Sequence, residues 1–118
     1  MRQPLNPRRS AMTLHMNYRM NGNDVEFAVT YGFDQVARVR EVFLKPFKLG
    51  TDMQAILRQD SMVMSVALQH GATMAELVHV LGEDESDKPP RSIIGLIVRA
   101  GANLESELLE RAKAVGVA

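Results

Sequence analysis

The chain has 118 residues, no cysteine and a formal net charge of zero, with 14 Lys or Arg balanced by 14 Asp or Glu. This length is enough for one domain that buries its own core. The lack of cysteine excludes thiol nucleophiles, disulfides and thiolate metal sites, and the zero charge gives no general attraction to nucleic acid. No apolar run approaches the roughly 20 residues of a membrane span. Without a signal-peptide segment near Met1, we expect a cytoplasmic protein.

Two prolines and three arginines within residues 1–10 predict a flexible basic arm, and residues 11–118 are expected to form a single domain. Apolar residues alternate with polar ones from Met12 to Met20, which is typical of a strand with one buried face. Asn21-Gly22 then predicts a tight hairpin turn. A second alternating strand follows, from Val25 to Phe33, and a turn near Asp34 leads to a third strand over residues 36–44. These strands should form an antiparallel meander.

Three helices are predicted after the strands. Thr51 is a suitable N-cap for a helix that runs to about His70 and ends at Gly71. Thr73 and Glu76 fit a capping box that opens a short second helix. Ser92 can cap a last helix, after a solvated acidic and proline-containing loop over residues 82–91. The order β-β-β-α-α-α predicts an α+β fold with the helices packed on one face of the sheet.

Several short motifs in the middle of the chain resemble the TSCPD domain family. They are Glu41-Val42-Phe43-Leu44, the helix start at Gly50-Thr51, and Ser65-x-x-Leu68-Gln69-x-Gly71, and the likeness covers residues 26–81. This domain is found at the C-terminus of adenosylcobalamin-dependent ribonucleotide reductases and in short stand-alone bacterial proteins. The chain is similar to the stand-alone, cysteine-free members. The resemblance implies a small regulatory or accessory module, and it transfers neither metal binding, nor thiol exchange, nor reductase activity.

Two carboxylates fall on otherwise apolar faces. Asp60 lies on the apolar face of the first predicted helix, and Glu41 shares a strand face with Val39 and Phe43. Because a buried charge is costly unless it is paired, both could converge with His70 on one polar pocket between sheet and helix. One interpretation is a ligand or proton-transfer site. The other is a structural ion pair, or a helix rotated so that Asp60 reaches the rim.

A second candidate site is a basic patch beside the first predicted helix. A helix N-terminus favours phosphate, and cationic or hydroxyl side chains flank this one: Arg38, Arg40, Lys45, Lys48 and Thr51. The spacing is not that of a phosphate-binding P-loop, so Thr51 also fits a simple helix cap. His15, His70 and His79 match no zinc motif, so we predict neither a metal nor another cofactor.

The first and last helices are apolar beyond a single stripe, and a helix apolar all round must be covered on every side. A three-stranded sheet covers only one side. We therefore expect contacts with a protein partner, most simply a homodimer, through Met62, Val66, Ile93, Ile94 and Ile97. The alternative is a monomer in which the last helix covers the first.

No recognisable catalytic motif occurs, so we do not expect an enzyme. The leading hypothesis is a non-enzymatic interaction module that acts through protein–protein contacts. The alternative is a regulatory protein that binds a nucleotide or nucleic acid through the basic patch.

Overall fold

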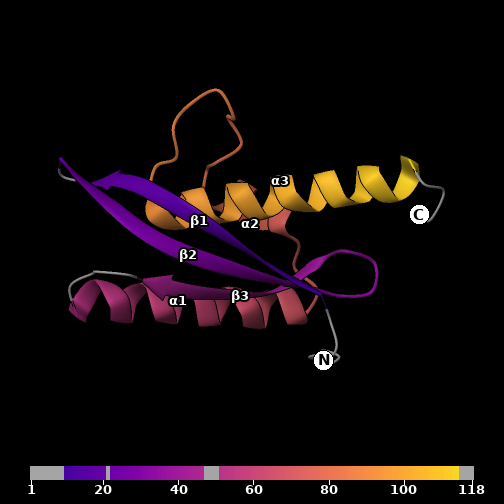
Figure 1. Cartoon of the computed structure of the whole chain (residues 1–118), viewed down its shortest axis with the longest axis horizontal. Coiled ribbons are helices and arrows are strands. Elements are labelled where there is room, and N and C mark those ends of the chain that lie inside the picture. The colour runs from indigo at the N-terminus through magenta and orange to yellow at the C-terminus, as the bar shows by residue number, and fades with distance from the viewer. Residues whose placement is uncertain (1–9, 21, 47–50, 115–118) are drawn as a thin grey trace.

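The computed structural model describes residues 10–20, 22–46 and 51–114. Three antiparallel strands form one open sheet and three helices follow, which confirms the predicted α+β fold (Figure 1). The predicted basic arm lies outside the described residues except for Ser10.

The sheet has the strand order β1-β2-β3. β1 (Ala11–Met20) pairs with β2 (Asn23–Phe33), and β2 pairs with β3 (Val39–Pro46), both antiparallel. Between β1 and β2, Gly22 has φ = 80°, as the predicted hairpin turn requires. Its predicted turn partner, Asn21, lies outside the described residues.

The third strand begins at Val39, three residues later than the sequence predicts. The reason is a turn organised by Asp34, whose Oδ1 accepts hydrogen bonds from the backbone N–H groups of Val36 and Arg38, each at 3.0 Å. Ala37 has φ = 64° in this turn, a left-handed conformation that cannot continue a strand. A short acceptor side chain that binds the backbone two and four residues later competes with strand pairing.

Asp34 gives the fold a pH dependence. Burial of its carboxyl group raises the pKa, but hydrogen bonds from the Arg38 N–H, the Arg40 side chain and the Val36 N–H outweigh burial and hold the pKa below the ordinary 3.8. A carboxyl group with a lowered folded-state pKa stabilises the fold above its unfolded-state pKa, and this contribution is lost as the pH falls through the folded-state pKa.

We predict that Asp34→Asn lowers the free energy of unfolding at neutral pH, and that the deficit against the wild type shrinks in acid. Urea denaturation at a series of pH values measures both effects. The exposed Asp87→Asn, which lies in the loop before the last helix, is the control and should change stability little at any pH. A deficit that stays constant into acid would contradict this role of Asp34.

Helix α1 (Thr51–Gln69) runs along the free edge of β3. The Ser65 hydroxyl accepts a hydrogen bond from the Val42 N–H at 2.9 Å and donates one to the Val42 carbonyl oxygen at 3.2 Å. Gln69 Nε2 donates to the Arg40 carbonyl oxygen at 3.4 Å. These side chains use backbone groups that an exposed edge strand would offer to another chain. The edge of β3 is therefore closed to strand addition at this point.

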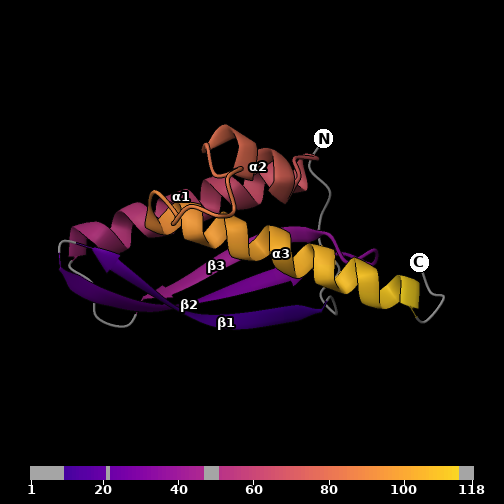
Figure 2. The same cartoon turned by 90° about the horizontal axis from the view of Figure 1, so that it is seen from above.

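Helices α2 (Met74–Val80) and α3 (Ile93–Ala114) complete the fold. The predicted capping box is present, since the Glu76 N–H donates to Thr73 Oγ1 at 3.1 Å and the Thr73 N–H donates to Glu76 Oε1 at 3.0 Å. Ser92 caps α3 as predicted, and its Oγ accepts from the Gly95 N–H at 2.9 Å. Figure 2 shows α3 lying across the sheet.

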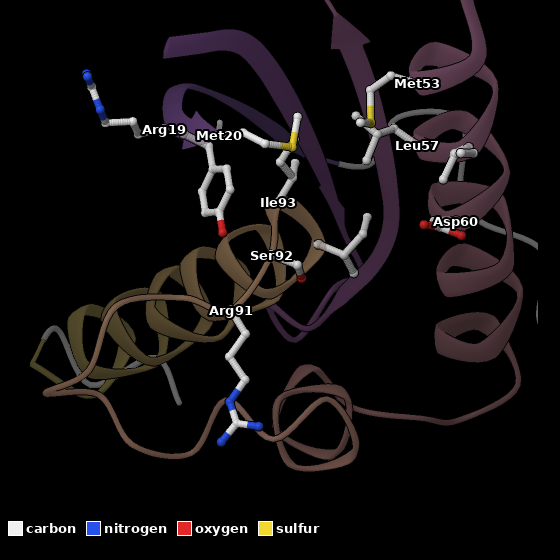
Figure 3. A pocket seen from close by; sticks show the side chains of 11 residues that line it. Arg19, Met20, Met53, Leu57, Asp60, Arg91, Ser92 and Ile93 are labelled. Carbon is white, nitrogen blue, oxygen red and sulfur yellow. The ribbon is translucent and has the colours of Figure 1, made fainter. Parts of the chain in front are cut away.

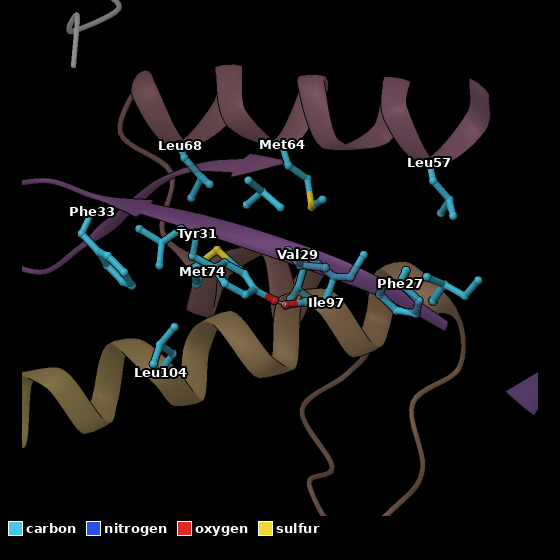
Figure 4. Close-up of a cluster of buried hydrophobic side chains, with 14 residues drawn as sticks. Phe27, Val29, Tyr31, Phe33, Leu57, Met64, Leu68, Met74, Ile97 and Leu104 are labelled. Carbon is cyan, nitrogen blue, oxygen red and sulfur yellow. Dashed lines mark hydrogen bonds between the residues drawn. The ribbon is translucent and has the colours of Figure 1, made fainter. Parts of the chain in front are cut away.

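The core lies between the inner face of the sheet and the helices (Figure 4). At its centre Tyr31 is fully buried, and its hydroxyl donates to the Ile97 carbonyl oxygen at 2.6 Å. Burial raises the pKa of Tyr31, so the phenol stays neutral. Gly101 lets α3 approach this ring, because a Cβ at that position would lie 2.8 Å from Tyr31 Cε1 and 2.5 Å from Met74 Cε.

The other sheet face carries the polar residues that the alternation predicts. Thr13, His15, Asn17, Arg19 and Glu26 are exposed. Thr13 and Thr30 are directly paired across β1 and β2, and their hydroxyl oxygens lie 2.7 Å apart. The helices therefore cover one face of the sheet and leave the other to solvent, as expected.

Candidate functional site

A cavity of about 460 Å³ lies between the hairpin end of the sheet, α1 and the start of α3 (Figure 3). Its apolar lining comes from all three elements: Met20, Met53, Ile56, Leu57, Ile93 and Ile94. The antiparallel register brings the end of β1 to this place, and the Ser92 cap fixes the start of α3 opposite it. The cavity therefore depends on segments more than seventy residues apart in the sequence.

Asp60 is the acidic residue of the lining, and Figure 3 shows its carboxylate directed from α1 toward the cavity. No hydrogen bond or ion pair joins this carboxylate to another residue in the described part of the chain. Arg19 and Arg91 also line the cavity, but their guanidinium groups point away from it (Figure 3). Arg19 Nη1 instead lies 3.4 Å from Asp24 Oδ1.

Two other polar side chains of the lining have partners within the chain, whereas the Arg91 guanidinium group, which points away from the cavity (Figure 3), has none in the described part of the chain. The Tyr18 hydroxyl donates to the Pro90 carbonyl oxygen at 3.4 Å, and the Ser92 hydroxyl is occupied as the α3 cap. Asp60 thus differs from Arg91 in that its unpaired charge is directed into the cavity (Figure 3).

The predicted polar pocket of Glu41, Asp60 and His70 does not form as one site. Glu41 pairs with Gly32 and, by strand alternation, lies on the face opposite the buried Val42. His70 is exposed just after the last residue of α1, where its Nδ1 lies 3.0 Å from the Val66 carbonyl oxygen. Neither residue lines the cavity at Asp60. The prediction was wrong in joining them, because it placed Glu41 on the inner sheet face.

The predicted basic patch is divided between the two ends of α1. Arg40 Nε lies 3.0 Å from Asp34 Oδ2, and its Nη1 donates to the carbonyl oxygens of Leu68 and Ala72 at 2.9 and 3.3 Å. Arg40 therefore donates hydrogen bonds to carbonyl groups at the C-terminal end of α1. These groups lack partners within the helix, and the helix dipole favours a cation there.

The other described members of this patch lie elsewhere. Arg38 Nη1 is 3.7 Å from Glu105 Oε1. Lys45 is exposed near the other end of β3, roughly 23 Å from Arg38 at about 3.3 Å per strand residue. Thr51 is the first residue of α1 itself and not the N-cap before it, one position from the prediction, while its side chain and all of Lys48 lie outside the described residues. The described arginines and Lys45 do not converge on one anion.

The predicted interface residues separate into three groups. Ile93 and Ile97 are buried inside the chain, at 4% and 0% exposure, so the prediction that they face a partner was wrong. Ile94 is half-buried and lines the cavity. Met62 and Val66 are exposed on α1, as the prediction requires. The sheet, the cavity and the loop before α3 surround the start of this helix within one chain. Its apolar residues therefore do not require a partner chain to cover them.

The exposed apolar residues of α1 form one stripe on the side away from the sheet: Ile56, Met62, Val63 and Val66. Met62 and Val63 are 62% and 69% exposed. The opposite side of α1 carries Leu57, Met64 and Leu68, which are buried in the core (Figure 4). Helix α1 is thus apolar on both sides, and the chain covers only one of them.

Two buried acids were missed by the sequence reasoning. Glu83 is 2% exposed although it belongs to the predicted solvated loop. Its Oε2 accepts from the Arg91 N–H at 2.9 Å, and its Oε1 lies 2.9 Å from Arg99 Nη2. Glu105 is 6% exposed, and its Oε2 accepts from the Val39 N–H at 2.7 Å. Glu83 therefore joins the loop before α3 to that helix, and Glu105 joins α3 to the start of β3. An acid after a glycine, or one in a charged helix segment, gives no sequence signal that it is buried.

These features define the class of protein as a small α+β domain with an apolar outer helix face and a cavity that contains one uncommitted carboxylate. No family model, no curated protein and no solved structure matches the chain. Within residues 10–20, 22–46 and 51–114, no three His, Asp or Glu side chains gather as a metal site, and no helix is long and apolar enough to cross a membrane.

Proposed function

We propose that this chain is a non-enzymatic interaction module that associates with a second copy of itself through the outer side of α1. The observation that supports the proposal is the exposed apolar stripe of Ile56, Met62, Val63 and Val66. Side chains of this size gain about 1.5–3 kcal/mol each when they are fully removed from water. We further propose, from the motifs quoted above, that the module is TSCPD-like and regulatory.

The spacing of the stripe favours another helix as the partner. Positions 52, 56, 59, 63, 66 and 70 recur at intervals of four and three residues, the spacing of a seam between two packed helices. Ile56, Val63 and Val66 occupy apolar positions of this seam, with the exposed Gln59 between them. The length of α1, 19 residues, gives a contact roughly 28 Å long at about 1.5 Å per residue.

The charges at the ends of the seam favour an antiparallel pair. Asp52 lies at its start and His70 at its end, and both are exposed. In an antiparallel two-fold pair, each Asp52 faces His70 of the second copy, whereas a parallel pair would place like residues together. The two helix dipoles also oppose each other favourably in this arrangement. A two-fold axis is the commonest closed symmetry for such contacts.

We predict that Val63→Glu shifts the protein from dimer to monomer, because each dimer would bury two unpaired carboxylates in the seam. Light scattering after size-exclusion chromatography, over a concentration series, measures the mass. The matched control is Val36→Glu, since Val36 is similarly exposed, at 65%, but lies in the turn before β3. Glutamate has at least the helix propensity of valine, so folding of Val63→Glu should be intact.

The proposal fails if the wild type is monomeric at all concentrations, or if both variants have the same mass profile as the wild type. The nucleic-acid alternative makes a different prediction, a salt-dependent affinity that falls when Lys45 is changed to Glu.

A further inference from the structure

We propose that the cavity at Asp60 binds a small organic cation, with an ammonium head at the Asp60 carboxylate and an apolar body among Met20, Met53, Leu57 and Ile93. This site shares Ile56 with the seam proposed for self-association, so its test is made both in the wild type and in a monomeric background. Its volume of about 460 Å³ falls within the range of about 300–1,000 Å³ that is usual for small-molecule sites.

We infer the charge of the ligand from the ionised side chains that line the cavity, by comparing which of them point into it without a partner. Asp60 is half-buried and faces the cavity without a hydrogen bond or ion pair in the described part of the chain. A cation that brings its own N–H donors would form charge-assisted hydrogen bonds with this carboxylate. The guanidinium groups of Arg19 and Arg91 are directed elsewhere (Figure 3), so the chain does not itself neutralise Asp60 there.

An anionic ligand is disfavoured by the same geometry. The start of α3 borders the cavity. Its Gly95 and Leu96 N–H groups are not available to an anion, because they donate to the Ser92 hydroxyl and carbonyl oxygens, at 2.9 and 3.0 Å. An anion in the cavity would also approach the Asp60 carboxylate, and like charges repel each other.

The walls determine the rest of the ligand. Two methionines from different elements, Met20 and Met53, face one another across the cavity with Leu57 and Ile93. Thioether side chains are flexible and polarisable, and they contact aromatic rings favourably. The class that fits is therefore a primary amine that carries an aromatic or branched aliphatic group.

Three probes of similar size test the assignment: 2-phenylethylamine, its neutral alcohol analogue 2-phenylethanol, and the anion phenylacetate. Binding is measured by NMR titration of the methyl groups of Met53, Leu57 and Ile93. We expect 2-phenylethylamine to bind at least tenfold more tightly than the alcohol, and phenylacetate to give no shifts. A tenfold change corresponds to about 1.4 kcal/mol.

Asp60→Asn removes the charge at nearly constant size and should weaken amine binding at least tenfold while leaving alcohol binding unchanged. Asp52→Asn is the matched control, because Asp52 is an exposed acid on the same helix outside the cavity, and it should bind the amine as the wild type does. Met53→Trp fills the cavity without changing charge and should weaken both the amine and the alcohol. The monomeric background of Val63→Glu should give the same ranking.

Equal affinity for the amine and the alcohol, equal loss in both aspartate variants, or no methyl shift with any of the probes would each overturn the assignment. Circular dichroism of every variant checks that the fold is retained.

Discussion

Replacement of Glu83 by alanine is expected to lower the free energy of unfolding by about 3 kcal/mol, the lower end of the cost of breaking a buried ion pair. Glu83 is 2% exposed, and its two oxygens contact the Arg91 N–H and Arg99 Nη2, each at 2.9 Å. Without the carboxylate, the partners that Arg99 keeps among the described residues are the carbonyl oxygens of Glu85 and Lys88. A loss of this size is a large part of the stability of a small domain, about 5–15 kcal/mol.

The matched control for this prediction is Glu85→Ala, on the same loop. Glu85 pairs with Lys88 at 2.8 Å, but both side chains are largely exposed, and exposed pairs contribute about 0–1 kcal/mol. Glu83→Gln should fall between the two, because it retains an acceptor for the Arg91 N–H while removing the charge. Urea denaturation followed by circular dichroism gives all three values. Equal losses for Glu83→Ala and Glu85→Ala would show that Glu83 has no special role.

The second large effect is expected for Gly101→Val, which should lower the free energy of unfolding by about 3 kcal/mol, at the upper end of overpacking costs. A Cβ there would lie 2.5 Å from Met74 Cε and 2.8 Å from Tyr31 Cε1. The Met74 methyl group is the end of a flexible side chain and can turn aside. The Tyr31 ring cannot, because it is fully buried and its hydroxyl is bonded to the Ile97 carbonyl oxygen at 2.6 Å.

The control for this substitution is Asn103→Val, two residues further along α3 at an exposed position. Asparagine and valine have similar helix propensities, so stability should change by no more than about 0.5 kcal/mol. The double variant Met74→Ala/Gly101→Val separates the two contacts. Because Met74→Ala by itself removes a fully buried side chain, the double variant is compared with Met74→Ala alone. If Tyr31 is the rigid partner, Gly101→Val should cost as much in that background as in the wild type, and loss of this cost would contradict the explanation.

The element order and most element boundaries were predictable from the sequence because their signals are local. Strand alternation, the hairpin glycine at Gly22, the Thr73–Glu76 capping box and the Ser92 cap each act within a few residues. The start of β3 was missed although its cause is also local, since the Asp34 side chain binds the backbone of Val36 and Arg38. An aspartate before a valine-rich stretch does not by itself show how far its turn extends.

The candidate sites were predicted less well, because each depends on which side of an element meets the core. Asp60 does face a cavity, but Glu41 lies on the opposite sheet face, and Arg40 is used by the end of α1. Ile97 and Val66 are both apolar residues in apolar helix segments, yet one is buried and the other is exposed. The residue types and spacing around Ile97 and Val66 are nearly the same, so only the packing of the folded chain determines which of the two is buried.

The sequence alone determined the strands, the helices, their order and the polar face of the sheet, because backbone propensity, alternation and capping act between near neighbours. Tertiary structure alone decided which side of α1 is covered, which acids are buried, and which segments enclose the cavity at Asp60. Glu83 and Arg99 are 16 positions apart in the sequence, and Tyr18 and Ile94 are more than seventy positions apart. Contacts over such separations arise only when the whole chain has packed, since burial and desolvation depend on everything that surrounds a side chain.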